Sequence, residues 1–416
     1  MTLVGEVLAI GDELIHGALL DTNSKYIAQQ LEALGVTVHR FVVTSDDPDH
    51  LRSALRDACG RADIVVATGG LGPTLDDRTR DLVAEVLDGP LWFDAASWQQ
   101  VQQWLQQRGR PVPDSNRRQA MFPPGAQPIS NPVGTAPAFA VQVGRARLFA
   151  LPGVPREMQV LLRDAVLPAI ARLPGLQPTA QLWLRILGPS EAALGERIEP
   201  FMVPGRNPAV GITASGGLLT IRIVATAGTR EAAAAACEAT AAELRPLVGE
   251  WLFAEGTIEL PEAVLQRLRQ AGHTLALAES CTGGLIAARL TDVPGSSAVL
   301  QGGVVAYANA AKQQLLGVPA ALLAAHGAVS VEVAAAMAQG ARERFAASVG
   351  VATTGIAGPD GGTADKPVGT VCFAIATAAK TRSWLLRIPD LGRTFVRDRA
   401  VFEVWRSLLQ LPDGAS

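Results

Sequence analysis

Residues 63–67, Asp-Ile-Val-Val-Ala, form a nearly all-apolar segment of strand length that constrains the fold of the first part of the chain. Strands that are apolar on both faces are typical of parallel sheets covered by helices on both sides. Apolar strand patterns at 3–10 and 36–43 alternate with helical patterns at 24–34 and 45–58. Because strands that alternate with helices favour a doubly wound sheet, we expect the chain to begin with an α/β domain.

A glycine-rich loop at 68–79 follows this strand and leads to two adjacent carboxylates, Asp76 and Asp77. Backbone N–H groups of such a loop can cradle a phosphate, and carboxylates can hold the hard cation that bridges a pyrophosphate. The first strand ends in Gly-Asp-Glu, which places Asp12 at the carboxyl end of the same sheet. The sequence therefore predicts metal ligands at Asp12, Asp76 and Asp77. The loop residues expected to contact the ligand are Gly69, Gly70, Gly72 and Thr74. The alternative is a turn in which Asp76 or Asp77 caps the next helix.

Five segments of this half, at 11–17, 69–79, 116–121, 131–137 and 151–158, resemble the N-terminal domain of the CinA family (competence/damage-inducible protein A) in order and spacing. The resemblance implies a molybdopterin-binding-like α/β sandwich, which in some members hydrolyses ADP-ribose with a divalent cation such as Mg²⁺, Mn²⁺ or Co²⁺. Further ligand contacts implied by it are Asn131, Gly134 and Thr135. Because relatives of this fold bind molybdopterin instead, a nucleotide- or pterin-binding scaffold without turnover is the alternative for this half.

A short segment with two prolines and a glycine at 174–178 separates this half from a small α+β pattern. The expected elements are strands at 182–187, 207–212 and 218–225 and helices at 191–198 and 231–248. The family's middle domain resembles a KH fold, but no basic face for nucleic acid is evident. Gly216-Gly217 predicts a hairpin turn rather than a G-x-x-G clamp. We expect a spacer or dimerisation element, and a homodimer.

A strand–turn–helix pattern at 275–290 marks the last part of the chain. The apolar strand ends in Glu279. The turn that follows is Ser280, Cys281, Thr282, Gly283 and Gly284. Two glycines at the mouth of a helix let the backbone approach a ligand, and free N–H groups there favour an anion. The turn is also a place where an acyl-transfer nucleophile can be exposed. The alternative is that Ser280 or Thr282 only caps the helix.

Two other strand ends in this part carry polar turns. Tyr307 and Lys312 follow the strand pattern at 301–307, and a second glycine-rich loop at 354–363 follows the strand pattern at 349–353. In one sheet the three strand ends would meet at a single edge, which favours a functional site over a capping turn. A buried lysine near a tyrosine can lose its proton and act as a base. The alternative is a boundary aromatic and a solvated lysine.

Segments 279–284, 307–312, 327–330 and 354–369 are similar to the CinA C-terminal domain, the nicotinamide mononucleotide (NMN) deamidase family. The departure noticed is Ala308, where a serine is common. An α/β domain and conversion of NMN to nicotinic acid mononucleotide and ammonia are implied, without a metal. The resemblance covers essentially the whole chain.

The same resemblance implies roles for individual residues. Ser280 would be the nucleophile, Lys312 the base and Tyr307 a proton relay or orienter, with the N–H groups of 281–284 as oxyanion donors. Cys281 is the competing nucleophile, although no nearby His or Asp in the sequence offers to activate it. The positions that would contact the substrate are Glu279, Cys281, Thr282, Gly283, Gly284, Asn309, Thr354, Gly355, Gly358, Arg393 and Arg397. Either arginine would face the phosphate.

The length of 416 residues fits the three expected domains, 1–173, 176–253 and 257–416. The net charge of -3 and the mixed acids and bases give no electrostatic footprint for nucleic acid. The four cysteines are far apart and form no C-x-x-C pair, and the first residues form no basic leader. No apolar run reaches the roughly 18 residues of a membrane span. We therefore expect a cytoplasmic hydrolase whose partners are NMN and ADP-ribose, with no membrane and no nucleic acid.

Overall fold

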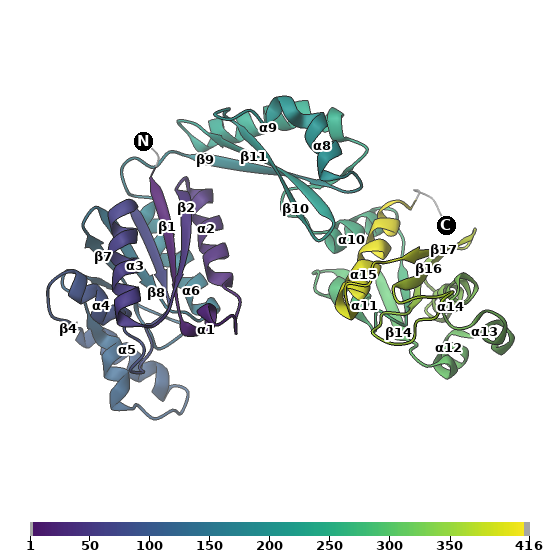
Figure 1. Ribbon diagram of the computed structural model, residues 1–416, viewed down its shortest axis with the longest axis horizontal. Helices are drawn as coiled ribbons and strands as arrows, with labels where there is room; N and C mark the ends of the chain where they lie inside the picture. The colour runs from purple at the N-terminus through teal and green to yellow at the C-terminus, as the bar shows by residue number, and fades with distance from the viewer. Residues whose placement is uncertain (1–2, 412–416) are drawn as a thin grey trace. The chain divides into compact units, whose positions relative to one another are not determined.

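The computed structural model describes residues 3–411 (Figure 1). The first two residues of the expected domain 1–173 and the last five of the expected domain 257–416 lie outside the described residues. The chain divides into two compact units, one built mainly from residues up to 182 and the other mainly from residues after 243, with the middle segment shared between them.

The N-terminal domain is built on one mixed sheet with the strand order β2-β1-β3-β8-β7-β6. Its strands are β1 (Val4–Ile10), β2 (Thr37–Thr44), β3 (Ile64–Thr68), β6 (Gln127–Ile129), β7 (Ala138–Val143) and β8 (Ala146–Leu151). The first four strands in this order are parallel, and β7 and β6 run antiparallel to their neighbours. The predicted α/β fold is confirmed, and the carboxyl ends of β1 and β3 lie next to each other.

Helices cover both faces of this sheet. They are α1 (Asp12–Ile15), α2 (Thr22–Leu34), α3 (Pro48–Arg61), α4 (Thr79–Val86), α5 (Ala95–Gln106), α6 (Pro155–Leu161) and α7 (Leu167–Ile170), with a 3-10 segment at Asp114–Ala120 and a π turn at Leu162–Val166. Val65 packs into one core with α3 and α4, whereas its neighbour Val66 packs into the other core with α2 and α6. Each face of β3 is buried, which explains why the strand is apolar throughout.

Some predicted boundaries in this domain are wrong. The glutamine-rich segment from Trp92 to Arg108 has a helical sequence pattern, but α5 begins only at Ala95, because β4 (Trp92–Phe93) pairs with β5 (Met121–Phe122) and Asp94 caps the helix through the Ser97 N–H. The helical sequence pattern after Pro155 continues to about residue 173, but the helix contains the π turn and ends at Ile170. The capping alternative for Asp76 and Asp77 is also wrong, because α4 begins after Arg78 without a side-chain cap.

The middle segment forms a four-stranded sheet with the order β10-β11-β9-β12 and two helices. Its elements are β9 (Thr179–Ile186), α8 (Glu191–Ile198), a 3-10 turn (Glu199–Phe201), β10 (Ala209–Ser215), β11 (Leu218–Thr226), α9 (Arg230–Val248) and β12 (Leu252–Glu255). Gly216 and Gly217 both have positive φ and close the hairpin between β10 and β11, as predicted. The strand expected at 207–212 runs from 209 to 215 instead.

The C-terminal domain has a five-stranded sheet with the order β14-β13-β15-β16-β17. The strands are β13 (Leu275–Glu279), β14 (Leu300–Val305), β15 (Val349–Gly355), β16 (Thr370–Ala376) and β17 (Thr381–Arg387). The helices are α10 (Leu260–Gln270), α11 (Leu285–Thr291), α12 (Asn309–Leu316), α13 (Ala320–His326), α14 (Val331–Arg344) and α15 (Arg393–Leu409), with a 3-10 turn at Ser296–Ala298. Because β14, β13 and β15 are parallel, their carboxyl ends lie side by side.

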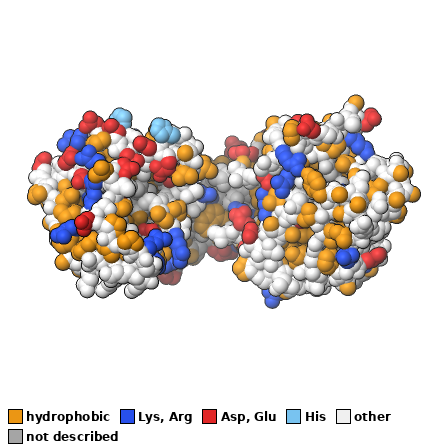
Figure 2. Space-filling model, turned by 90° about the horizontal axis from the view of Figure 1, so that it is seen from below, with side chains coloured by type: hydrophobic (Ala, Val, Ile, Leu, Met, Phe, Trp, Pro, Cys, Tyr) orange, Lys and Arg blue, Asp and Glu red, His pale blue; other side chains and the backbone are white. Residues whose placement is uncertain are grey.

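Side chains of different kinds are mixed on the surface. On the face shown in Figure 2, acidic, basic and apolar groups are interspersed over each unit. None of the helices within residues 3–411 is long and apolar enough to cross a membrane.

Candidate functional site

The three parallel strand ends of the C-terminal domain enclose a pocket of about 180 Å³. The positions named from the sequence that line it are Ser280, Cys281, Tyr307, Asn309, Lys312, Thr354, Gly355 and Arg393. They come from the ends of β13, β14 and β15, from the start of α12 and from the start of α15.

The fold therefore brings together residues that lie on four separate segments.

Lys312 is buried in this pocket, with 1% of its surface exposed. Its Nζ donates to the carbonyl oxygens of Ala306 at 2.9 Å and Tyr307 at 3.1 Å, and it lies 3.3 Å from Ser280 Oγ. No carboxylate of the described residues forms an ion pair with it. Burial lowers the pKa of Lys312 from its ordinary value of 10.5. A neutral amine has two N–H donors and one lone pair, so it can satisfy both carbonyls and still accept the Ser280 proton.

Ser280 is held by the backbone on both sides. Its N–H donates to the Thr353 carbonyl at 2.9 Å, and its carbonyl accepts from the Gly283 N–H at 3.0 Å. Gly283 is therefore not a free oxyanion donor. The capping alternative for Ser280 and Thr282 is wrong, because the N-cap of α11 is Gly284 and no side chain caps it there. The Ser280 hydroxyl is left to face the pocket and Lys312.

Cys281 lies beside Ser280 on the pocket wall but is a poor nucleophile. Only 4% of its surface is exposed. Burial raises the pKa of its thiol to about 12. Since the thiolate is the reactive form, almost none is present at neutral pH.

Six of the positions predicted to contact substrate do not line the pocket: Glu279, Thr282, Gly283, Gly284, Gly358 and Arg397. The Glu279 carboxylate is buried and accepts from two N–H groups of α11, those of Ile286 at 3.1 Å and Ala287 at 2.9 Å. Thr282 is fully buried, and its hydroxyl bonds the Thr353 hydroxyl. The side chains of Glu279 and Thr282 therefore hold the turn after β13 in place.

The two arginines divide between the pocket and the turn. Arg397 donates to the Thr282 carbonyl at 2.8 Å, which holds the turn, and Arg393 lines the pocket. Arg393 donates to the Gly358 carbonyl at 2.8 Å and to the Tyr307 hydroxyl at 2.7 Å. The Tyr307 hydroxyl therefore faces Arg393, while the Tyr307 carbonyl holds Lys312.

One wall of the pocket was not assigned from the sequence. Ala328 and Val329 line it. Thr354 Oγ1 donates to the Ala328 carbonyl at 2.8 Å, and Lys366 Nζ donates to the carbonyls of His326 at 2.8 Å and Val329 at 2.7 Å. Small apolar residues carry no chemical signal in a sequence, so only the fold reveals this wall.

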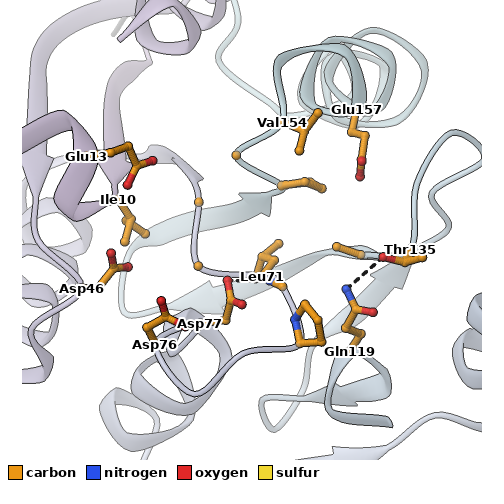
Figure 3. Close-up of a pocket in the computed structure, with 18 of the residues that line it drawn as sticks. Ile10, Glu13, Asp46, Leu71, Asp76, Asp77, Gln119, Thr135, Val154 and Glu157 are labelled. Carbon is orange, nitrogen blue, oxygen red and sulfur yellow. Dashed lines mark hydrogen bonds between the residues drawn. The ribbon is translucent and has the colours of Figure 1, made fainter. Parts of the chain in front are cut away.

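The N-terminal domain has a larger pocket of about 580 Å³ at the carboxyl ends of β1 and β3 (Figure 3). The positions named from the sequence that line it are Gly69, Gly70, Gly72, Asp76, Asp77 and Thr135. Four polar residues that sequence reasoning missed also line it, namely Glu13, Asp46, Gln119 and Glu157. Gly72 has no room for a side chain, because a Cβ there would overlap the Asp77 carboxylate.

The three predicted metal ligands do not converge on one point. Asp12 does not line the pocket; its carboxylate accepts the Asp46 N–H at 3.2 Å. Asp77 accepts from the N–H groups of Gly72 at 2.7 Å and Thr74 at 2.9 Å, so it holds the loop. Among residues 3–411 no group of three His, Cys, Asp or Glu side chains is placed to hold a metal ion.

The acids of this pocket nevertheless crowd one another. Burial raises the pKa of Asp46, and repulsion from Asp12, Glu13 and Asp76 raises it further, against the bond from the Asp12 N–H, which lowers it. Crowded carboxylates of this kind fit a hard cation that takes one or two protein oxygens and completes its shell with substrate phosphates. Among the described residues that line the pocket there is neither Lys nor Arg.

Three other positions that the sequence predicts as ligand contacts lie outside the pocket lining. Thr74, Asn131 and Gly134 do not line the pocket. Asn131 is buried and donates to the Glu157 carboxylate at 2.7 Å, and a Cβ on Gly134 would overlap the same carboxylate. Asn131 and Gly134 therefore hold Glu157.

Three family models match successive parts of the chain. They are described as "Probable molybdopterin binding domain" (residues 6–172), "Damage-inducible protein CinA KH domain" (residues 182–254) and "CinA C-terminal domain" (residues 257–411).

Similar proteins span nearly the whole chain. A CinA-like protein of Anaeromyxobacter dehalogenans is 45% identical over 96% of this chain and 97% of its own length. A putative competence-damage inducible protein of Symbiobacterium thermophilum is 43% identical over 90% and 88%. Among solved structures, a competence/damage inducible protein of Agrobacterium tumefaciens is 43% identical over 36% of this chain and 92% of that chain, with a TM-score of 0.35. The matches to the full-length relatives show that this chain belongs to the CinA family.

Proposed function

We propose that the C-terminal domain hydrolyses the carboxamide of NMN to give nicotinic acid mononucleotide and ammonia. The observation that carries the proposal is the contact between Ser280 Oγ and Lys312 Nζ, with the lysine buried and bonded to two carbonyls. A serine hydroxyl attacks only when a base accepts its proton. A lysine whose pKa is lowered by burial can be such a base, because burial favours the neutral form that accepts a proton.

The residues support a two-step acyl transfer. Ser280 Oγ bonds to the carboxamide carbon while its proton passes to Lys312 Nζ. Lys312 then returns this proton to the amide nitrogen, the carbon–nitrogen bond breaks, and ammonia leaves. Water attacks the resulting ester with Lys312 again accepting a proton, which it gives to Ser280 Oγ as the acid is released.

The rest of the pocket supports a nucleotide of this kind. Its volume of about 180 Å³ suits the pyridine ring and carboxamide, and the remainder of the nucleotide would extend to its mouth. Arg393 and Asn309 line the pocket and are exposed, so they can bind the phosphate and the ribose. No group in this mechanism requires a metal.

A second activity is proposed for the N-terminal domain, namely metal-dependent hydrolysis of ADP-ribose to AMP and ribose 5-phosphate. The supporting observation is a pocket that is lined by carboxylates but by no cationic side chain. A pyrophosphate is repelled there unless a divalent cation such as Mg²⁺, Mn²⁺ or Co²⁺ comes with it. Asp76 and Asp46 are the acids placed to hold the cation, which would neutralise charge on the phosphate oxygens. A binding scaffold without turnover is the alternative.

The two activities are tested together on the purified protein. NMN and ADP-ribose are supplied separately, with and without divalent cation, and ammonia and AMP are followed in parallel. We expect ammonia from NMN without added metal, and AMP from ADP-ribose only with it. Absence of ammonia contradicts the deamidase, and metal-dependent binding of ADP-ribose without AMP release supports the scaffold.

The proposal also covers the cellular location and the oligomeric state of the protein. We infer a cytoplasmic homodimer whose partners are these small nucleotides, with the middle segment as a spacer or dimerisation element. Sedimentation equilibrium tests the dimer, since the expected mass is twice that of one chain.

A further inference from the structure

Glu157 stands apart from the other acids of the N-terminal pocket. It lies on α6, and its carboxylate points into the cavity across from Asp46, Asp76 and Asp77 (Figure 3). The latter three come from the ends of β2 and β3 and their loops, so the two sets of acids belong to opposite walls. Because Glu157 is a single carboxylate on the wall opposite this cluster, it can have a different role from the clustered acids.

The Glu157 carboxylate is held in place by the loop at residues 131–136. Asn131 Nδ2 donates to its Oε2 at 2.7 Å and also to the Ala136 carbonyl at 2.9 Å. Asn131 is 1% exposed, and its Oδ1 accepts the Val133 N–H at 3.1 Å. Gly134 leaves the space that the carboxylate fills. The loop thus fixes where the oxygens of Glu157 lie.

The electrostatic surroundings of Glu157 differ from those of the other acids. Burial raises the pKa of Glu157 above its ordinary value of 4.5, and the Asn131 amide lowers it in part. Among residues 3–411, no charged side chain contributes to this shift. The titratable groups that face the same cavity are Glu13, Asp46, Asp76 and Asp77, and the neighbours on its own wall, Gln119 and Thr135, are uncharged. A carboxylate in such a place accepts a proton more readily than an exposed one.

We propose that Glu157 is the general base of the pyrophosphate hydrolysis at this pocket, an inference that rests on the activity proposed above for the N-terminal domain. Glu157 accepts a proton from water as the water oxygen bonds to one phosphorus. The bond from that phosphorus to the bridging oxygen breaks, and the oxygen leaves with the electron pair as part of the second phosphate product. The proton on Glu157 then passes to solvent.

The first test compares Glu157→Gln with the wild-type chain and with Asp164→Asn. The glutamine keeps the size of the side chain and an oxygen for Asn131. Asp164 is a matched control, because it is an exposed acid just after α6 whose ion pair is with its neighbour Arg163. We expect Glu157→Gln to lower kcat for ADP-ribose by ~10²–10⁴-fold, as for loss of a general base, and to change KM by less than about threefold. The acidic limb of the kcat profile should disappear in this variant and persist in Asp164→Asn.

The second test needs no metal and no turnover. Because the folded-state pKa of Glu157 is raised, the folded protein is most stable below pH 4.5 with respect to this group and loses that stability as pH rises through the folded pKa. The glutamine variant has no carboxyl group at this position to ionise, so it does not lose stability in this way as pH rises. The Tm of Glu157→Gln minus the Tm of the wild type should therefore increase with pH, whereas the same difference for Asp164→Asn should not.

The outcomes separate this inference from the proposed activity. If the wild type releases AMP and Glu157→Gln does so at the same rate with its acidic limb intact, Glu157 is not the base although the activity stands. If the variant loses its thermal shift by ADP-ribose with Mg²⁺ along with turnover, Glu157 has a binding role and the inference is wrong. If the wild type releases no AMP with Mg²⁺, Mn²⁺ or Co²⁺, the activity fails and its base fails with it.

Discussion

At the scale of single residues, the environment of Lys312 decides the chemistry of the C-terminal pocket. Its amine is buried, no carboxylate of the described residues pairs with it, and two backbone carbonyls take its N–H groups. Burial of this kind favours the neutral form. The neighbouring Cys281 shows the opposite case, because the same burial keeps its thiol protonated. In the proposed mechanism, burial therefore favours the proton-accepting form of Lys312 beside Ser280, whereas it keeps the Cys281 thiol protonated.

The first prediction concerns the pH dependence of deamidation. Lys312 must be neutral to accept a proton, and its pKa is lowered from 10.5. We expect kcat/KM for NMN to rise with pH to a plateau, with a midpoint below 10.5. The linked effect on folding has the same direction, since stability rises as pH increases from the folded pKa toward 10.5. A midpoint at 10.5 or above, or a kcat/KM that falls as pH rises toward 10.5, would show that Lys312 is not the base.

Residue types that carry chemistry were visible in the sequence, but their partners were not. Ser280, Tyr307 and Lys312 all follow apolar strands, and the end of a strand is a position that a sequence can show. The hydrogen-bond partners of a side chain depend on how segments that are distant in the sequence pack together. The bond from Asn131 to Glu157 and the bond from Arg393 to the Tyr307 hydroxyl are of this kind.

At the scale of elements, the turn from β13 to α11 is the unit that presents Ser280. Glu279 is the last residue of β13, and its carboxylate accepts from the Ile286 and Ala287 N–H groups at the start of α11. An anion at a helix N-terminus is favoured both by these donors and by the helix dipole. The protein's own carboxylate therefore occupies the place that the sequence suggested for a substrate anion.

The second prediction tests this turn. Glu279→Gln replaces a charged acceptor by a neutral one at a buried site. We expect the free energy of unfolding of the C-terminal domain to fall by about 1–3 kcal/mol, with a smaller loss of kcat than for Ser280→Ala. Glu343→Gln, a change at an exposed position near the end of α14, is the control and should alter neither quantity. Unchanged stability in Glu279→Gln would mean that the carboxylate does not hold the turn.

The order of strands and helices was readable because its pattern is local. The apolar strand 64–68 and the three polar strand ends of the C-terminal domain follow from periodicity alone. Elements that depend on distant partners were missed, such as β4, which exists only because Trp92–Phe93 pairs with Met121–Phe122. The π turn at Leu162–Val166 gives no periodic signal that separates it from a helix.

At the scale of the whole molecule, the two proposed sites lie in separate domains. Each pocket is lined only by residues of its own domain. The core of the C-terminal domain is formed mainly by its own sheet and helices, with Leu187 and Leu218 of the middle segment packed against it. The C-terminal domain should therefore need little from the rest of the chain for catalysis.

The third prediction follows from this independence. A fragment from Thr257 to Ser416 should be soluble and should release ammonia from NMN with a kcat close to that of the full chain. Its Tm should be somewhat lower, because the contacts of Leu187 and Leu218 and the ion pair of Arg185 with Glu259 are lost. An insoluble or inactive fragment would show that the site depends on the remaining chain.

The most direct test of the account is ammonia release from NMN by the wild type, Ser280→Ala and Cys281→Ala, each checked for its Tm. Ser280→Ala should lower kcat by ~10³-fold or more, as for other nucleophile deletions, while its Tm stays within a few degrees of the wild type. Cys281→Ala should keep most of the activity. An active Ser280→Ala beside an inactive Cys281→Ala would contradict the assignment, and so would a Ser280→Ala variant that is inactive only because it no longer folds.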